Sequence, residues 1–138
     1  MDIIEKIREK LGRYPQIKFE ESDNSITILP VSDDGFEVAL YVDDSHSREP
    51  YQVCFNGWHE YFSDPTEALE CFVFGLSDEC RLRQHSRNGK AYRWTVEFRR
   101  DGHWHEESTT SHLWVPFWKS SSVEYFQNRL ITRTDENG

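Results

Sequence analysis

Two short turn signals in the second half of the chain constrain its fold more than any other feature. They are an Asn-Gly pair at residues 88–89 and an Asp-Gly pair at residues 101–102, and such pairs are typical of tight turns between antiparallel strands. The stretches around them alternate apolar and polar residues with the two-residue period of a strand. The prediction is a three-stranded antiparallel ribbon with strands over residues 80–85, 91–99 and 103–109.

The register of this ribbon is inferred from the pairing of its apolar residues. A two-residue loop at the first turn would set Arg83 opposite Trp94. A longer turn, with its glycine in a left-handed bulge, pairs Leu82 with Trp94 instead and so places apolar on apolar. We therefore predict the bulged register at both turns, and in the second turn it pairs Phe98 with Trp104. The choice matters because a slip of one residue exchanges the two faces of a strand.

The predicted register gives the ribbon two different faces. The first is apolar and is expected to lie against a helix; its residues are Leu82, Tyr92, Trp94, Val96, Phe98 and Trp104. The second is polar and rich in cations; its residues are Arg81, Arg83, His85, Arg93, Thr95, Glu97, Arg99, His103, His105 and Glu107. On this polar face Glu97 is expected to stand opposite His105.

The polar face supplies the first candidate site. Arginine side chains bind phosphate and carboxylate groups through two parallel hydrogen bonds, so this face suits a small anionic ligand or an acidic protein surface. The candidate binding residues are Arg81, Arg83, Arg93, Glu97, Arg99, His103 and His105. The alternative is an ordinary solvated sheet face whose cations pair with acidic neighbours across the sheet.

A metal-dependent site on the same face is a further interpretation. His103 and His105 would share one face of a strand, with Glu97 or Glu107 as a third ligand. This spacing arises easily by chance, and a surface pair between His105 and Glu97 accounts for it more simply. The sequence contains no glycine-rich phosphate loop, zinc-ligand spacing or nucleophile motif, so no catalytic residue, metal ligand or cofactor is assigned.

Two helices are predicted outside the ribbon. Asp2 can cap a short helix over residues 3–11, whose apolar residues form one stripe. Asp64 and Pro65 are a strong start for a helix over residues 64–77. The apolar residues of this second helix are dense, which predicts burial on more than one side.

These elements predict an α+β fold. Strands are also expected over residues 24–31, 36–43, 51–56, 112–118 and 123–128. Short polar connections favour a meander, so we expect a single twisted antiparallel sheet of about six to seven strands. Helix 64–77 should cover its apolar face as the central helix, with helix 3–11 docked beside it. Residues 1–138 are predicted to form a single domain in which 132–138 are a frayed tail.

Charge is distributed unevenly along the chain, whose net charge is −9. Residues 19–80 contain 15 acidic residues and one basic residue, whereas residues 81–100 contain seven basic residues and one acidic residue. Either the two segments neutralise each other across a sheet, or the acidic segment is a surface for a basic partner. The residues of the predicted partner surface are Asp33, Asp34, Asp43 and Asp44.

The cysteines and the hydropathy indicate a location. Cys54, Cys71 and Cys80 form an odd set without a C-x-x-C spacing, which is typical of buried thiols in a reducing compartment. No apolar run approaches the roughly 18 residues of a membrane span, and the acidic N-terminus is unlike a signal peptide. We therefore expect a cytoplasmic protein without a membrane partner.

The segment over residues 56–62 is interpreted as a loop between the third strand and the second helix. It contains the neighbouring pair His59 and Glu60, and loops commonly carry catalytic groups. No nucleophile with a matching spacing accompanies the pair. Trp58 and Phe62 are therefore expected to close the core beneath this loop.

The preferred functional hypothesis is a non-enzymatic cytosolic protein-binding module of the adaptor, inhibitor or immunity type. It rests on the acidic segment, which suits a basic protein as partner, and on the lack of a catalytic constellation in the sequence. The alternative hypothesis is a small anionic-ligand or metal-dependent site on the Arg/His-rich face. Nucleic acid is disfavoured as a partner by the net charge of −9.

Overall fold

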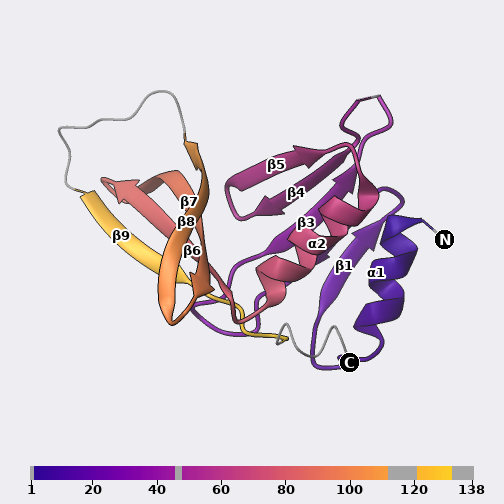
Figure 1. The fold of residues 1–138 in the computed structure, drawn as a ribbon, viewed down its shortest axis with the longest axis horizontal. Helices are drawn as coiled ribbons and strands as arrows, with labels where there is room; N and C mark the ends of the chain where they lie inside the picture. Colours follow the sequence, from indigo (N-terminus) through magenta and orange to yellow (C-terminus); the bar gives the residue numbers. More distant parts are fainter. Residues whose placement is uncertain (1, 46–47, 112–120, 132–138) are drawn as a thin grey trace.

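A computed structural model describes residues 2–45, 48–111 and 121–131. In these residues the chain forms two helices and nine strands, and the strands belong to two antiparallel sheets (Figure 1). The predicted α+β class is confirmed, but the single sheet is wrong because the strands divide into groups of five and four. The predicted strand 112–118 and the predicted frayed tail 132–138 lie outside the described residues.

The first sheet is an antiparallel meander in which each strand pairs with the next along the chain. Its strands are β1 (Phe19–Ser22), β2 (Ser25–Ile28), β3 (Val38–Val42), β4 (Tyr51–Phe55) and β5 (Trp58–Phe62). The strands predicted over 24–31, 36–43 and 51–56 correspond to β2, β3 and β4. Strand β1 was not predicted.

Strand β5 occupies the segment that was interpreted as a loop, so that interpretation is wrong. The chain reverses at Asn56 and Gly57, where Asn56 has a φ of 52°, and Phe55 then pairs with Trp58 across the turn. This Asn-Gly pair is the same short-range signal that marks the turn at residues 88–89. The strand it begins brings His59 and Glu60 onto a sheet edge.

Both predicted helices are confirmed. Helix α1 (Ile3–Leu11) and helix α2 (Pro65–Leu76) begin after Asp2 and Asp64, whose side chains each accept a hydrogen bond from a backbone amide of the first turn. The last position of α2 is followed by Ser77 in an extended conformation. Neither helix is long and apolar enough to cross a membrane, as far as the described residues go.

Helix α2 packs mainly on the first sheet, against β3, β4 and β5, and to a lesser extent on the first strand of the ribbon, which corrects the predicted packing (Figure 1). At Gly75 the helix comes so close to the sheet that an added Cβ would lie 2.4 Å from the ring of Phe55. Helix α1 contacts α2 through its buried stripe of Ile3, Ile4, Ile7 and Leu11. The two helices therefore share one face of the five-stranded sheet.

The second sheet contains the ribbon and one further strand, in the order β8-β7-β6-β9. Its strands are β6 (Cys80–Arg87), β7 (Lys90–Arg100), β8 (His103–Ser111) and β9 (Ser121–Phe126). Strand β9 corresponds to the strand predicted over 123–128 and pairs with β6, so it lies at the edge opposite β8.

The hairpin turns of this sheet have two residues each, which corrects the predicted bulged turns. Positive φ angles of 52° and 79° at residues 88–89, and of 53° and 78° at residues 101–102, are those of a type I′ turn. The bulges lie inside the strands instead. In the first hairpin Leu82 therefore stands opposite Val96 and not opposite Trp94. Because that shift is by two residues, the predicted faces of β6 and β7 are kept.

The bulge in the first hairpin falls at Tyr92, the extra residue between two successive pairs of the ladder. Its ring lies 6.3 Å from the ring of His85. The guanidinium groups of Arg87 and Arg93 lie 5.7 Å and 5.6 Å from its centre. Tyr92 therefore contacts the polar face, whereas the apolar face was predicted for it.

The two sheets meet along β5 and β8. The indole Nε1 of Trp58 donates a hydrogen bond of 2.8 Å to Ser108, and the backbone of His59 exchanges hydrogen bonds of 3.3 Å with Thr110. A Cβ on Gly57 would lie 2.3 Å from the ring of Trp94. One buried apolar cluster extends from the helices and the first sheet to β6 and β7 of the second.

Candidate functional site

The polar face of the second sheet is organised around the buried carboxylate of Glu97. Its side chain is only 5% exposed and forms ion pairs of 2.7 Å with Arg81 and 3.0 Å with Arg83. A carboxylate that has left water needs such partners, because an unpaired buried charge is strongly unfavourable. The sequence-predicted residues Arg81, Arg83 and Glu97 therefore do lie together.

Two cations of this face, Arg81 and Arg83, have carboxylate partners within the same sheet. Arg83 also forms an ion pair with the exposed carboxylate of Glu106. The guanidinium of Arg81 lies between two rings, 4.4 Å from that of Trp104 on β8 and 4.3 Å from that of Tyr125 on β9. Arg81 on β6 therefore contacts a ring from each of the two edge strands, β8 and β9. The guanidinium groups of Arg81 and Arg83 are thus already bound to other side chains of the same chain.

His103 and His105 lie away from Glu97, which corrects the predicted His-Glu arrangement. The two-residue turn at residues 101–102 sets His105 opposite Phe98, and their rings stack at 5.3 Å. The register therefore differs by one residue from the predicted one, and such a shift exchanges the faces of a strand. Trp104 and Glu106 occupy the polar face in place of the two histidines. The signal that could have shown this was the Asp-Gly pair itself, whose preference is for a two-residue turn.

The other predicted residues of the polar face are spread along it. Arg93 pairs with His85 at the far end of the hairpin, whereas Arg99 forms an ion pair of 3.5 Å with Asp78. Burial, together with the charges of Arg83 and Arg93, lowers the pKa of His85. Among the described residues, no group of three His, Cys, Asp or Glu side chains is placed to hold a metal ion.

The acidic segment over residues 19–80 lies largely at the surface. Thirteen of its fifteen carboxylates are exposed, and the other two, Asp78 and Glu79, are half-buried. Ion pairs hold Glu21 to Arg8 at 2.7 Å and Asp34 to Arg129 at 3.0 Å. Asp78 forms an ion pair with Arg99, which is one of the bases of residues 81–100. The acidic surface is therefore present in the folded chain.

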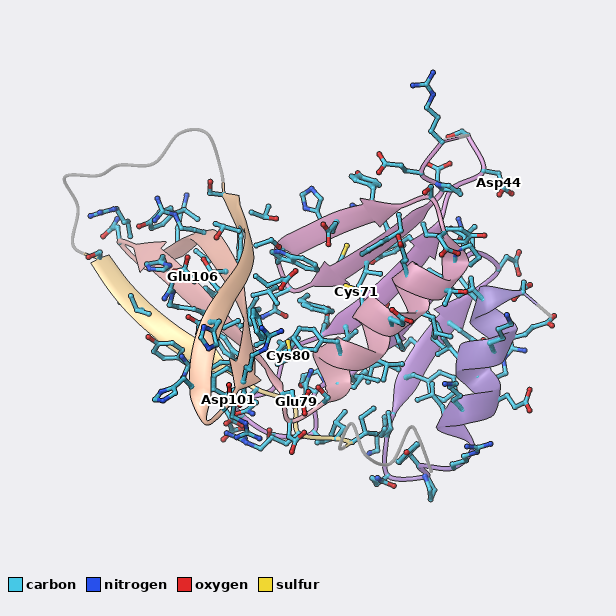
Figure 2. All side chains as sticks on the ribbon, viewed as in Figure 1. Asp44, Cys71, Glu79, Cys80, Asp101 and Glu106 are labelled. Atoms are coloured by element: carbon cyan, nitrogen blue, oxygen red, sulfur yellow. The ribbon has the colours of Figure 1, made fainter. Side chains whose placement is uncertain are left out.

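The predicted partner-surface residues form two separate groups. Asp33 and Asp34 precede β3, and Asp43 and Asp44 follow it, so a five-residue strand of about 17 Å separates them. Hydrogen bonds from Ser32 and from Arg129 lower the pKa of Asp34. Figure 2 shows Asp44 in the loop at the end of the first sheet that points away from the second sheet.

The three cysteines are protected thiols. Burial raises the pKa of Cys54 to about 11 and also raises the pKa values of Cys71 and Cys80. A thiol that keeps its proton near neutral pH is a weak nucleophile. These side chains are therefore poor candidates for covalent catalysis.

A cleft between the two sheets is the feature that sequence reasoning missed. Its volume is about 530 Å³, and it is lined by β5, α2 and the second sheet. Two of its carboxylates, Glu60 and Glu107, owe their positions to features that the sequence did not predict. Glu60 lies on the unpredicted strand β5, and Glu107 is the extra residue of the bulge in β8.

Comparison of the chain with protein-family models, with curated proteins and with solved structures found no match.

Proposed function

We propose that this protein is a non-enzymatic binding module that recognises a basic protein through its acidic surface. The observation that carries the proposal is the exposure of thirteen carboxylates within residues 19–80. Dense exposed charge of one sign attracts an oppositely charged partner over several ångströms and speeds its association. An adaptor, an inhibitor or an immunity-type protein would each use such a surface.

Two further observations support a binding role over a catalytic one. The raised pKa values of the thiols keep them protonated, and a protonated thiol does not attack a substrate readily. Two arginines of the polar face, Arg81 and Arg83, already pair with Glu97 and Glu106, which leaves the anionic-ligand hypothesis with less support than the acidic surface.

The test is capture of partners from lysate of the source cells by the full chain, at low salt and at high salt. We expect a basic protein to be retained at low salt and lost near about 0.5 M salt, because that ionic strength screens exposed charges. The proposal would be contradicted if no basic protein is captured at low salt, or if the amount captured is the same at low and at high salt.

Charge-reversal variants locate the surface that is responsible. Asp33→Lys and Asp44→Lys change the two ends of β3 separately and are preferable to changes at Asp34, whose ion pair with Arg129 supports the fold. At least one of them should weaken capture about fivefold or more. Lys90→Glu, on the hairpin of the second sheet, is the matched control and should not weaken it.

A further inference from the structure

The cleft between the sheets is lined by both apolar and charged side chains. It lies where the sheets diverge from the contacts between Trp58 and Ser108, and Figure 1 shows α2 and β5 on one side and β7 and β8 on the other. The apolar side chains that line it are Phe55, Trp58, Phe62, Phe74, Val96 and Phe98. A volume of about 530 Å³ with aromatic walls is in the range of ligand-binding sites.

The carboxylates of the cleft give it a negative charge. They come from all of its walls: Glu60, Glu67, Glu70, Glu79 and Glu107, against the two bases Arg99 and Arg100. In the described part of the chain, neither Glu60 nor Glu107 has an ion pair. A cleft that combines apolar side chains with an excess of carboxylates is complementary to a cationic group that also has an apolar part.

Glu60 and Glu107 are close enough to act on the same groups. Burial raises the pKa of Glu60, and the charges of Glu107 and Glu49 raise it further. The charges of Glu60 and Glu107 also raise the pKa of Cys71, after the larger effect of burial. Figure 2 shows Cys71 on the side of α2 that faces the second sheet. A cation placed between the two glutamates would relieve their mutual repulsion.

We propose that this cleft is the docking site for an extended segment of the partner protein that alternates basic and apolar residues. Its lysine or arginine side chains place their aliphatic stems along Phe62 and Phe98 and their charged ends between Glu60 and Glu107. Long basic side chains bury their stems on apolar surface in this way. The aromatic walls add an attraction for the cation itself. This inference rests on the proposed function, because it identifies where one segment of the basic partner docks, in addition to the carboxylates at the two ends of β3.

The charge complementarity favours a protein segment over other occupants. An anionic membrane surface or a nucleic acid would be repelled by the cleft carboxylates. A free polyamine carries charge but has no apolar side chains to fill the space beside Trp58 and Phe98. The peptide carries both, so it is expected to bind more tightly than either component alone.

The test uses the full chain and defined synthetic peptides of eight residues with blocked ends. One peptide alternates lysine and leucine, a second alternates lysine and serine, and a third alternates glutamate and leucine. The indole resonance of Trp58, assigned with Trp58→Phe, reports binding because its Nε1–H donates to Ser108 at the edge of the cleft. We expect the first peptide to shift this resonance at the lowest concentration and the third to leave it unchanged.

Two glutamine variants test the carboxylates. Glu60→Gln and Glu107→Gln together should weaken binding of the lysine-leucine peptide about tenfold at low salt. The fold should be retained, since removing the Glu60 charge removes a repulsion. The matched control is Glu20→Gln on β1, which lies outside the residues lining the cleft and should leave binding unchanged.

The outcomes separate this inference from the proposed function. If lysate capture is salt-sensitive but the double glutamine variant captures and binds as well as the unchanged protein, the partner docks elsewhere and only the cleft proposal is wrong. If spermine shifts the Trp58 resonance at the same concentration as the peptide, the cleft is a site for small cations and the proposal is also wrong. If the unchanged protein shows no salt-sensitive capture, and the variants show none either, the proposed function itself is wrong.

Discussion

At the scale of single residues, Glu97 is the polar group on which the second sheet depends most. Its carboxylate is buried and joins Arg81 to Arg83. Removing one member of a buried ion pair leaves its partners without compensation and costs about 3 kcal/mol or more. Glu97→Gln should therefore lower the free energy of unfolding by about that amount in urea titrations.

Glu106→Gln is the natural control for this prediction. Glu106 also pairs with Arg83, but its side chain is 64% exposed. Exposed pairs contribute about 0–1 kcal/mol, so this variant should unfold almost like the unchanged protein. An equal loss in both variants would show that burial of Glu97 does not decide the effect.

The cysteines predict a pH dependence of stability. Burial raises the pKa of Cys54 to about 11 in the folded chain, against about 8.5 in an unfolded chain. Between these values the unfolded chain loses the proton and the folded chain keeps it, so the free energy of unfolding falls as pH rises. Below about pH 8.5 both states keep the proton, and Cys54 adds no slope.

Urea titrations at several pH values between about 7 and about 10.5 measure this slope. Cys54→Ala should show a shallower fall above about pH 8.5, because one of the titrating thiols is gone. Other groups titrate in the same range, so the difference between the two proteins is the decisive quantity. Identical slopes would contradict the raised pKa of Cys54.

At the scale of elements, the contact between α2 and the first sheet depends on Gly75. Alanine there would gain up to about 1 kcal/mol of helix propensity. Its Cβ, however, would lie 2.4 Å from the Phe55 ring, and overpacking a buried contact costs about 1–3 kcal/mol. Gly75→Ala should therefore be destabilising by about 2 kcal/mol in thermal or urea unfolding.

A smaller side chain at residue 55 provides the control. If the clash is the cause, Phe55→Leu should cost less in the Gly75→Ala background than in the unchanged protein, which is a measurable coupling between neighbours. Additive effects of the two substitutions would argue against the clash. A stabilising Gly75→Ala would show that propensity outweighs packing at this position.

The elements also show how much of the fold was predictable. Both helices begin where Asp2 and Asp64 cap them, because a capping hydrogen bond involves only residues within one turn. Most strands were found from their alternation. The turn at Asn56 and Gly57 carried the same signal as the turn at residues 88–89, so β5 was predictable in principle. What alternation alone does not give is the partner of each strand.

At the scale of the whole molecule, Asn128 connects segments that are distant in the chain. Its Oδ1 accepts from the amide of Phe36 at 2.9 Å, and its Nδ2 donates to the carbonyl of Gly75 at 2.9 Å. The side chain thereby fastens the segment after β9, in the second sheet, to the first sheet and to the end of α2. It is 5% exposed, so water cannot replace these bonds.

Asn128→Ala should lower the free energy of unfolding by about 3 kcal/mol, because it leaves a buried donor and a buried acceptor without partners. Asn128→Asp keeps the acceptor for Phe36 but sets a buried carboxylate oxygen against the carbonyl oxygen of Gly75, so at neutral pH its loss should be at least as large as that of Asn128→Ala. Urea unfolding measures both variants, and amide exchange at Phe36 reports the first bond directly. A neutral Asn128→Ala would mean that this connection contributes little to joining the sheets.

One part of the candidate site depends on local sequence and was predictable, and the other part depends on contacts between distant segments and was not. The cluster of Arg81, Arg83 and Glu97 was predictable because alternation fixes which residues of β6 and β7 share a face. The position of His105 was predicted wrongly, because the predicted register at the second turn was off by one residue. A shift of one residue exchanges the two faces of β8. The acidic character of residues 19–80 was visible in the sequence, but its distribution over two ends of β3 and the cleft was not.

The sequence by itself determined the two helices, most of the strands, the turn positions and the acidic character of the surface. These depend on each residue and its near neighbours, through capping, period and backbone preference. Only the tertiary structure decided the division into two sheets, the face of β8 and the placement of Glu60 and Glu107 in one cleft. Those depend on contacts between segments far apart in the chain, where the free energy of packing selects among registers and pairings that local preferences leave nearly equal.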